Sequence, residues 1–127
     1  MKILIVSDTH RRDENLRLLL EKVCPIDMLI HLGDAEGSEY EIMKWVDKGC
    51  DLEMIMGNND FFSDLPREEI IDLAGKKILV THGHTYGVSG GTDGIVEAAR
   101  ARGCEAVLFG HTHYPEIEMQ EGILVIN

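Results

Sequence analysis

The sequence has few cysteines, few aromatic residues and no long apolar run. Its three cysteines, Cys24, Cys50 and Cys104, lie far apart and form no Cys-x-x-Cys pair. We therefore expect reduced thiols in the core rather than disulfides or a structural zinc site. No apolar run approaches the roughly 20 residues that a membrane-spanning helix needs. The chain begins directly with a strand-like segment, without a signal-peptide pattern, so we expect a cytoplasmic protein with no membrane partner.

Positive charge is also scarce. The chain carries 12 lysine and arginine residues against 23 aspartate and glutamate residues, for a formal net charge of −11. Binding to nucleic acid or to an anionic membrane needs a basic surface, so this balance argues against both as partners. It leaves room for an anionic substrate if divalent cations supply the local positive charge.

With 127 residues the chain is long enough for one domain with a proper core. Hydrophobic periodicity predicts a first half in which strands alternate with helices and a second half built mostly of hairpins. The sequence therefore predicts a layered α/β domain with mixed sheets and helices outside them. We expect strands at residues 2–6, 28–30, 51–56, 69–73, 77–81, 106–109, 117–119 and 123–126, and helices at 13–23, 38–47 and 93–102. The first strand should be buried on both faces.

Several polar residues mark the ends of these elements. Ser38 with Glu41 forms a capping box for the second helix, which should end at Gly49, and Thr92 should cap the third. Residues 86–91 read as a glycine-rich loop at the rim of a site. This loop lacks the Gly-Lys-Ser/Thr ending of a P-loop, so we do not expect nucleotide binding by that route.

Two histidines two residues apart, His111 and His113, follow the buried strand at 106–109. On an extended backbone both side chains leave the same side, with Cβ atoms about 6–7 Å apart. That spacing suits convergence on one metal or on two neighbouring metals, with one histidine for each ion. Gly110 would let the backbone turn tightly as it leaves the strand.

Potential metal ligands follow the carboxyl ends of five predicted strands, where open α/β sheets bind their ligands. Five of the six histidines fall in these segments. Carboxylates and imidazoles together suit divalent Mn, Fe, Co, Ni or Zn. Asp34 is the best candidate for a carboxylate that bridges two ions, because Gly33 removes bulk beside it. The candidate ligands are Asp8, His10, Asp34, Asn58, His82, His111 and His113.

The ordered motifs of the chain resemble the signature of the calcineurin-like metallophosphoesterases, above all their small single-domain phosphodiesterase branch in bacteria and archaea. These motifs are Asp8-Thr9-His10, Gly33-Asp34, Gly57-Asn58-Asn59-Asp60, His82-Gly83-His84 and Gly110-His111-Thr112-His113. The resemblance implies a sandwich of two β-sheets and a site for two divalent ions. It implies that Asp8, His10 and His113 hold the first ion, that Asn58, His82 and His111 hold the second, and that Asp34 bridges both.

The expected activity is hydrolysis of a small phosphoester, with a phosphodiester favoured over a monoester. A hydroxide that bridges the two ions, Mn²⁺ being our first choice, would attack phosphorus. Many members of the family have a histidine after the asparagine, where it is thought to protonate the leaving group. This chain has Asn59 there, which cannot act as an acid. The catalytic candidates are therefore Asn59 and His84, and help for the leaving group comes from water or His84, or is not needed.

Alternatives remain open at this point. The same fold serves some relatives as a non-catalytic protein-interaction scaffold, and metal storage or sensing is a third interpretation. His84 would either contact substrate or make a structural hydrogen bond. His31 should be a buried histidine or a partner of a ligand, and Asp60 would orient a neighbour or cap a turn. Phe61 and Phe62 should pack under the loop that follows them.

Relatives of this type usually continue beyond the position of Asn127 with a Pro-Gly-Ser-like segment and a further strand. We therefore expect residues 1–127 to form one metallophosphoesterase domain without the usual C-terminal tail, which would leave a sheet edge open unless the sequence is incomplete. The sequence does not predict the oligomeric state.

Overall fold

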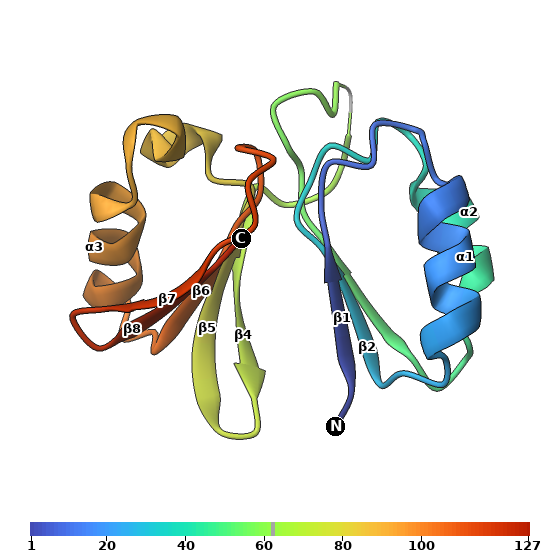
Figure 1. The fold of residues 1–127 in the computed structure, drawn as a ribbon, viewed down its shortest axis with the longest axis horizontal. Coiled ribbons are helices and arrows are strands. Elements are labelled where there is room, and N and C mark those ends of the chain that lie inside the picture. The colour runs from blue at the N-terminus through green and yellow to red at the C-terminus, as the bar shows by residue number, and fades with distance from the viewer. Residues whose placement is uncertain (62) are drawn as a thin grey trace.

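The computed structural model describes residues 1–61 and 63–127. It contains two β-sheets that face each other (Figure 1). The first has the order β1-β2-β3 and is parallel throughout, with β1 at Ile3–Val6, β2 at Met28–His31 and β3 at Asp51–Met54. The second has the order β4-β5-β6-β8-β7 and is mixed. Its strands are β4 (Glu68–Leu73), β5 (Lys76–Thr81), β6 (Ala106–Leu108), β7 (Ile117–Gln120) and β8 (Ile123–Ile126).

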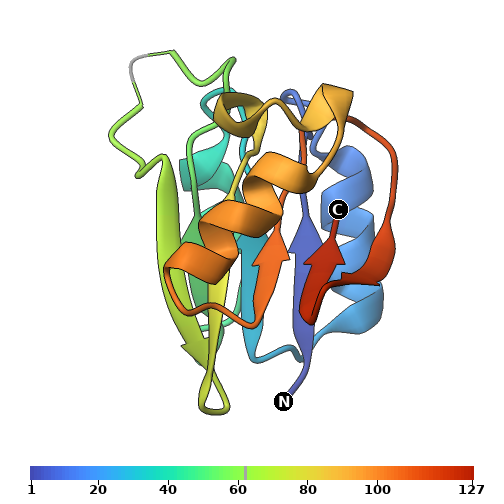
Figure 2. The same ribbon diagram turned by 90° about the vertical axis from the view of Figure 1, so that its left-hand side faces the viewer.

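Helices cover the outer face of each sheet. Figure 1 shows α1 (Glu14–Val23) and α2 (Glu39–Trp45) beside the three-stranded sheet. Figure 2 shows α3 (Asp93–Ala101) lying across the outer face of the five-stranded sheet. Two short 3₁₀ helices, η1 (His84–Tyr86) and η2 (Val88–Gly90), connect β5 to α3. The molecule is therefore a four-layer sandwich with the two sheets in the middle.

The apolar core follows from the alternation of side chains along each strand. On β5, Leu79 packs in the cluster beneath α3, whereas the next residue, Val80, packs between the two sheets. A third cluster lies under α1 and α2 and includes Leu16, Leu20 and Ile42. Burial on both faces fixes the register of the strands, because a slip by one residue would exchange the two faces.

The predicted fold class, two sheets packed as a sandwich with flanking helices, is confirmed. The first sheet differs in detail, since it is parallel rather than mixed. The expectation that β1 is buried on both faces is wrong, because all four of its residues are half-buried at the edge of the sheet. The loop expected at 86–91 contains η2 and the last residue of η1.

The predicted helix caps are also wrong. Ser38 precedes α2, but its side chain makes no capping hydrogen bond, and the helix ends at Trp45 rather than at Gly49. Thr92 precedes α3 and makes no cap either, because its hydroxyl is paired with the side chain of Gln120 on β7. A tertiary partner has replaced the local bond that the sequence pattern suggested.

Three smaller expectations concern side chains outside the sheets. All three cysteines are free thiols, but only Cys104 is buried in the core as expected, since Cys24 and Cys50 are half-buried. Phe61 is 76% exposed, so it does not pack under the following loop, and Phe62 lies outside the described residues. None of the helices in the described part of the chain has the length and hydrophobicity that a bilayer crossing requires.

Candidate metal centre

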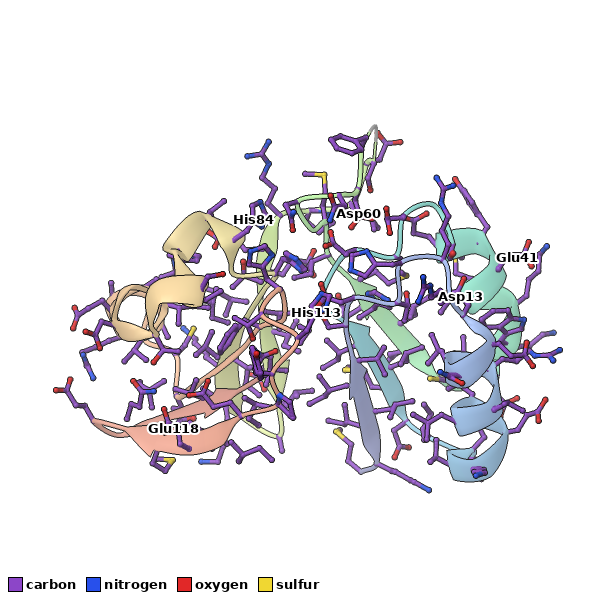
Figure 3. All side chains as sticks on the ribbon, turned by 45° about the horizontal axis from the view of Figure 1, so that its top comes forward. Asp13, Glu41, Asp60, His84, His113 and Glu118 are labelled. Atoms are coloured by element: carbon purple, nitrogen blue, oxygen red, sulfur yellow. The ribbon has the colours of Figure 1, made fainter. Side chains whose placement is uncertain are left out.

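The candidate ligands gather where the loops of the two sheets meet, beyond the carboxyl ends of the parallel strands. Asp8 follows β1, Asp34 follows β2 and Asn58 follows β3, while His82 and His111 follow β5 and β6. Figure 3 shows His84, His113 and Asp60 in this central region, whereas Glu41 and Glu118 lie on opposite outer flanks. All five ligand-bearing segments expected from the sequence thus reach one place.

The first group of side chains comprises Asp8, His10 and His113. Asp8 Oδ1 lies 3.7 Å from His10 Nε2 and 3.3 Å from His113 Nε2, and the two ring nitrogens are 3.4 Å apart. One ligand atom from each residue lies within 4.8 Å of the others. A single cation could therefore contact all three.

The second group comprises Asn58, His82 and His111. Asn58 Oδ1 lies 3.0 Å from His82 Nε2 and 3.0 Å from His111 Nδ1. An amide oxygen between two imidazole nitrogens offers three donor atoms to one ion. The two histidines of the His-x-His motif therefore belong to different groups, His111 to the second and His113 to the first.

Asp34 lies between the two groups. Its Oδ2 is 3.3 Å from His82 Nε2 in the second group and 3.9 Å from His10 Nε2 in the first. The side chain is almost fully buried. Asp8 Oδ1 is likewise 3.6 Å from His82 Nε2, so Asp8, Asp34 and His82 form a further set of potential ligands that joins the two groups. Asp34 is thus placed where a carboxylate could contact ions in both groups.

The donors fit a pair of divalent ions. Asp8 Oδ1 is buried and accepts no hydrogen bond within the described part of the chain, although three imidazole nitrogens surround it at 3.3–3.7 Å. An unpaired buried carboxylate oxygen is costly unless a cation neutralises it. Imidazole, carboxylate and amide donors suit the borderline divalent ions of the first transition row.

Most of the ligands have a left-handed backbone. The φ angles are +56° at Asp8, +48° at His10, +61° at Asp34, +72° at His111 and +62° at His113. For residues other than glycine this conformation costs about 1–2 kcal/mol each. The expectation that His111 and His113 lie on an extended backbone is therefore wrong. The two rings nevertheless reach separate groups, which is the arrangement with one histidine for each ion that the spacing allowed.

Two glycines allow the loops to approach closely. A Cβ atom on Gly57 would lie 2.6 Å from the backbone nitrogen of Asp34, and one on Gly110 would collide with Ser7 Oγ and lie 2.7 Å from Asp8 Oδ2. Gly110 thus provides room for the β1 loop. The expected tight turn is also present, since the N–H of Thr112 donates to the carbonyl oxygen of Gly110 at 2.9 Å, although the positive φ falls on His111 rather than on Gly110.

Hydrogen bonds behind the ligands fix the orientation of two rings. His82 Nδ1 donates to the carbonyl oxygen of Leu32 at 2.7 Å, and His10 Nδ1 lies 2.7 Å from Glu36 Oε2. In each case the hydrogen sits on Nδ1, which leaves the Nε2 lone pair directed at the candidate site. No motif in the sequence singles out Glu36.

Asp60 organises the backbone of the site. Its carboxylate is 5% exposed and accepts the N–H groups of Asp34, Glu36 and Gly57, each at 2.7 Å. It therefore ties the loop after β3 to the loop that carries Asp34. Of the two roles that the sequence left open, orientation of neighbours is the one that dominates.

The two catalytic candidates occupy different positions. Asn59 donates its backbone N–H to Asp34 Oδ1 at 2.8 Å and its side-chain amide to Asp34 Oδ2 at 3.1 Å. The ring of His84 lies 5.4 Å from that of His82 and 6.1 Å from that of His111. Burial, followed by the neighbouring charges of His82 and His111, lowers the pKa of His84. Its Nδ1 has no hydrogen-bond partner among the described residues.

His31 lies behind the site, as expected. The side chain is fully buried, and burial lowers its pKa to about 4. Its Nδ1 accepts the N–H of Gly33 at 3.2 Å, and its Nε2 faces Thr9 Oγ1 at 3.0 Å. A neutral imidazole thus joins the loops after β1 and β2.

A family model, the calcineurin-like phosphoesterase superfamily domain, matches residues 1–127. The chain belongs to this superfamily. It is 31% identical over 129 residues to the probable metallophosphoesterase YsnB of Bacillus subtilis, and the match covers the whole chain and 73% of YsnB. It is also 31% identical over 143 residues to the phosphodiesterase MJ0936 of Methanocaldococcus jannaschii, again over the whole chain and 82% of MJ0936.

The fold of this superfamily member agrees with solved structures. Wild-type Vps29 from Entamoeba histolytica, in a complex with zinc, superposes with a TM-score of 0.81 at 21% identity, over 100% of this chain and 73% of that one. At this identity the likeness concerns the fold alone. The family resemblance read from the motifs is confirmed, and with it a phosphoesterase family that uses divalent metals.

Proposed function

We propose that the chain is a phosphodiesterase that hydrolyses small phosphodiesters with two divalent transition-metal ions. The observation that carries the proposal is the position of Asp34 between two groups of ligand atoms at the carboxyl ends of strands from both sheets. The names of two relatives, a probable metallophosphoesterase and a phosphodiesterase, support the same class of reaction.

In this proposal Asp8, His10 and His113 hold one ion, Asn58, His82 and His111 hold the other, and Asp34 contacts both. Bound there, Mn²⁺ or a similar ion would polarise the phosphate oxygens and supply a hydroxide near neutral pH. The histidine tautomers set by Leu32 and Glu36 keep the Nε2 atoms of His82 and His10 free for this role.

Asn59 and His84 have separate roles in the proposed reaction. Asn59 holds both oxygens of Asp34 through its two N–H donors, so it positions the shared carboxylate. It has no proton to give to a leaving alkoxide. The lowered pKa of His84 keeps its ring neutral at pH 7, and a neutral imidazole can donate one hydrogen bond to a phosphate oxygen. Substrates whose leaving group departs without protonation are therefore favoured.

The activity is tested with bis(4-nitrophenyl) phosphate and 4-nitrophenyl phosphate, each with and without added Mn²⁺. We expect release of nitrophenolate that depends on the metal and is faster for the diester. If the metal-loaded protein hydrolyses neither these nor a wider set of phosphoesters, the non-catalytic scaffold is the better interpretation.

The ligand assignment is tested by metal analysis of two variants after dialysis against Mn²⁺. Asp34→Asn should reduce the occupancy of both ions, whereas His113→Ala should mainly empty one. Asp64→Asn, an exposed carboxylate in the loop after β3, is the control and should retain both ions. An unchanged stoichiometry in both site variants would refute the bridging role of Asp34.

A further inference from the structure

A hollow of about 280 Å³ adjoins the candidate metal centre on the side of His84. Its lining consists of Arg67, Glu68, His84, Thr85 and Tyr86. The ring of His84 forms part of this lining and also lies near His82 and His111. A substituent of a phosphate held at the metal centre could therefore extend into the hollow.

The strand ladder places Arg67 beside the same centre. The last residues paired between β4 and β5 are Glu68 and Thr81, so Arg67 comes opposite His82 when the ladder is continued by one step. The hydroxyl of Thr81 donates to the backbone carbonyl of Arg67 at 3.4 Å, which holds the two segments together. Directly opposite residues of an antiparallel pair point to the same face. The side chain of Arg67 therefore leaves the sheet on the face that carries His82.

The charge of Arg67 is available for a ligand. Its side chain is exposed, and within residues 1–61 and 63–127 no carboxylate lies within 4.0 Å of its guanidinium. Arg17, Arg100 and Arg102, in contrast, each pair with a glutamate at 2.6–2.8 Å.

The one carboxylate in the lining is already engaged. Glu68 accepts the hydroxyl of Tyr86 on Oε2 at 2.5 Å and pairs with Arg102 through Oε1 at 2.6 Å. Its negative charge is therefore compensated on the far side of the hollow. In a chain with a net charge of −11, an arginine without a partner at this place offers a local attraction for anions.

We propose that Arg67 and the hollow beside His84 form a subsite for a second anionic group, a phosphate or a carboxylate, on the substrate. The substrate class is then a phosphoester with a further negative charge one small spacer away from the phosphorus that reacts. A guanidinium recognises either anion through paired N–H donors. The inference rests on the proposed function for the position of the first phosphate.

Binding of phosphonates, which are not hydrolysed, tests the subsite. The Mn²⁺-loaded protein is titrated by calorimetry with phenylphosphonate, 4-carboxyphenylphosphonate and 1,4-phenylenediphosphonate. We expect the two compounds with a second anion to bind more tightly than phenylphosphonate. Arg67→Gln should weaken their binding by about tenfold, the factor for one charge-assisted hydrogen bond, and change phenylphosphonate by less than about twofold. If Arg67→Gln weakens the diphosphonate more than the carboxyphenylphosphonate, the subsite prefers a phosphate group. The opposite order indicates a carboxylate.

Arg17→Gln is the matched control, because it removes the same charge from the surface of α1. It should leave all three affinities unchanged. Equal weakening of all three compounds by Arg67→Gln, or equal effects of the two variants, would overturn the subsite.

Hydrolysis of bis(4-nitrophenyl) phosphate separates this inference from the proposed function. Its substituents carry no second anion, so its hydrolysis by the wild-type protein reports on the proposed function alone. If the protein hydrolyses this diester but Arg67→Gln does not change the phosphonate affinities, the subsite alone is refuted. If the phosphonate affinities depend on Arg67 but the protein hydrolyses no phosphoester, the proposed function is refuted and the subsite is retained.

Discussion

Replacing Asp60 by asparagine should loosen the metal centre without touching a ligand. The carboxylate accepts two N–H groups on Oδ2, from Asp34 and Gly57, and one on Oδ1, from Glu36. Asparagine offers a single oxygen, and its NH₂ group would face one of these N–H donors. Leaving one buried donor unpaired costs about 1–3 kcal/mol, and loss of charge from the other two bonds brings the expected destabilisation to about 2–4 kcal/mol.

The assay is urea unfolding of the metal-free protein, with Asp64→Asn as the control. Asp64 lies in the same loop but is exposed, so its replacement should change stability by less than about 0.5 kcal/mol. The Asp60→Asn variant should also retain fewer Mn²⁺ ions after dialysis, because the hydrogen bonds that anchor the backbone of Asp34 and Glu36 are lost or weakened. Equal unfolding midpoints for the two variants would refute the role assigned to Asp60.

Three further predictions concern pH and packing in the metal-free protein, measured by urea unfolding. Burial lowers the pKa of His31 from 6.5 to about 4, so its stabilising contribution is complete above pH 6.5 and is lost as pH falls toward 4. Between pH 8 and pH 5 this loss is about 2 kcal/mol, and His31→Gln should remove it from the pH profile. Burial, and next the neighbouring Glu69, raises the pKa of Glu53 from 4.5 to about 7, so its contribution is present below pH 4.5 and is lost as pH rises through 7. Glu53→Gln should therefore unfold at higher urea than wild type at pH 8 and at the same urea at pH 4; the reverse order would contradict the sign. Gly110→Ala should lose about 1–3 kcal/mol by overpacking, whereas Gly49→Ala, with open space around it, should be nearly neutral, and equal midpoints would refute the packing argument.

The sequence predicts the order of elements well, because periodicity is a local signal that burial then reinforces. Both α1 and α3 appear within one residue of the ranges expected from their apolar spacing. The position of the site was also predictable, since ligands that follow parallel strands meet at one edge of a sheet. Asp34 illustrates this, because its place after β2 was enough to put it at the centre.

The supporting residues could not be predicted in the same way. Asp60 acts on backbone N–H groups 24 and 26 residues away, and Glu36 contacts a ring 26 residues away. Every residue except proline has a backbone N–H group, so the sequence does not show which of these groups a distant carboxylate will bind. Thr92 shows the opposite case. Its position before α3 favours a helix cap, but its hydroxyl pairs with the side chain of Gln120 instead.

The strained backbone of the ligand loops adds a last physical argument about how the centre is built. A left-handed residue persists only where its surroundings hold it. Here the loops hold one another: the N–H of Asp8 donates to Gly33, that of His10 donates to Asp34, and that of Gly110 donates to His82, at 2.9–3.0 Å. Such bonds link neighbouring loops within each of the two sheets, so the donor atoms are brought together by the fold itself. These hydrogen bonds offset part of the backbone strain and hold the ligand loops beside one another.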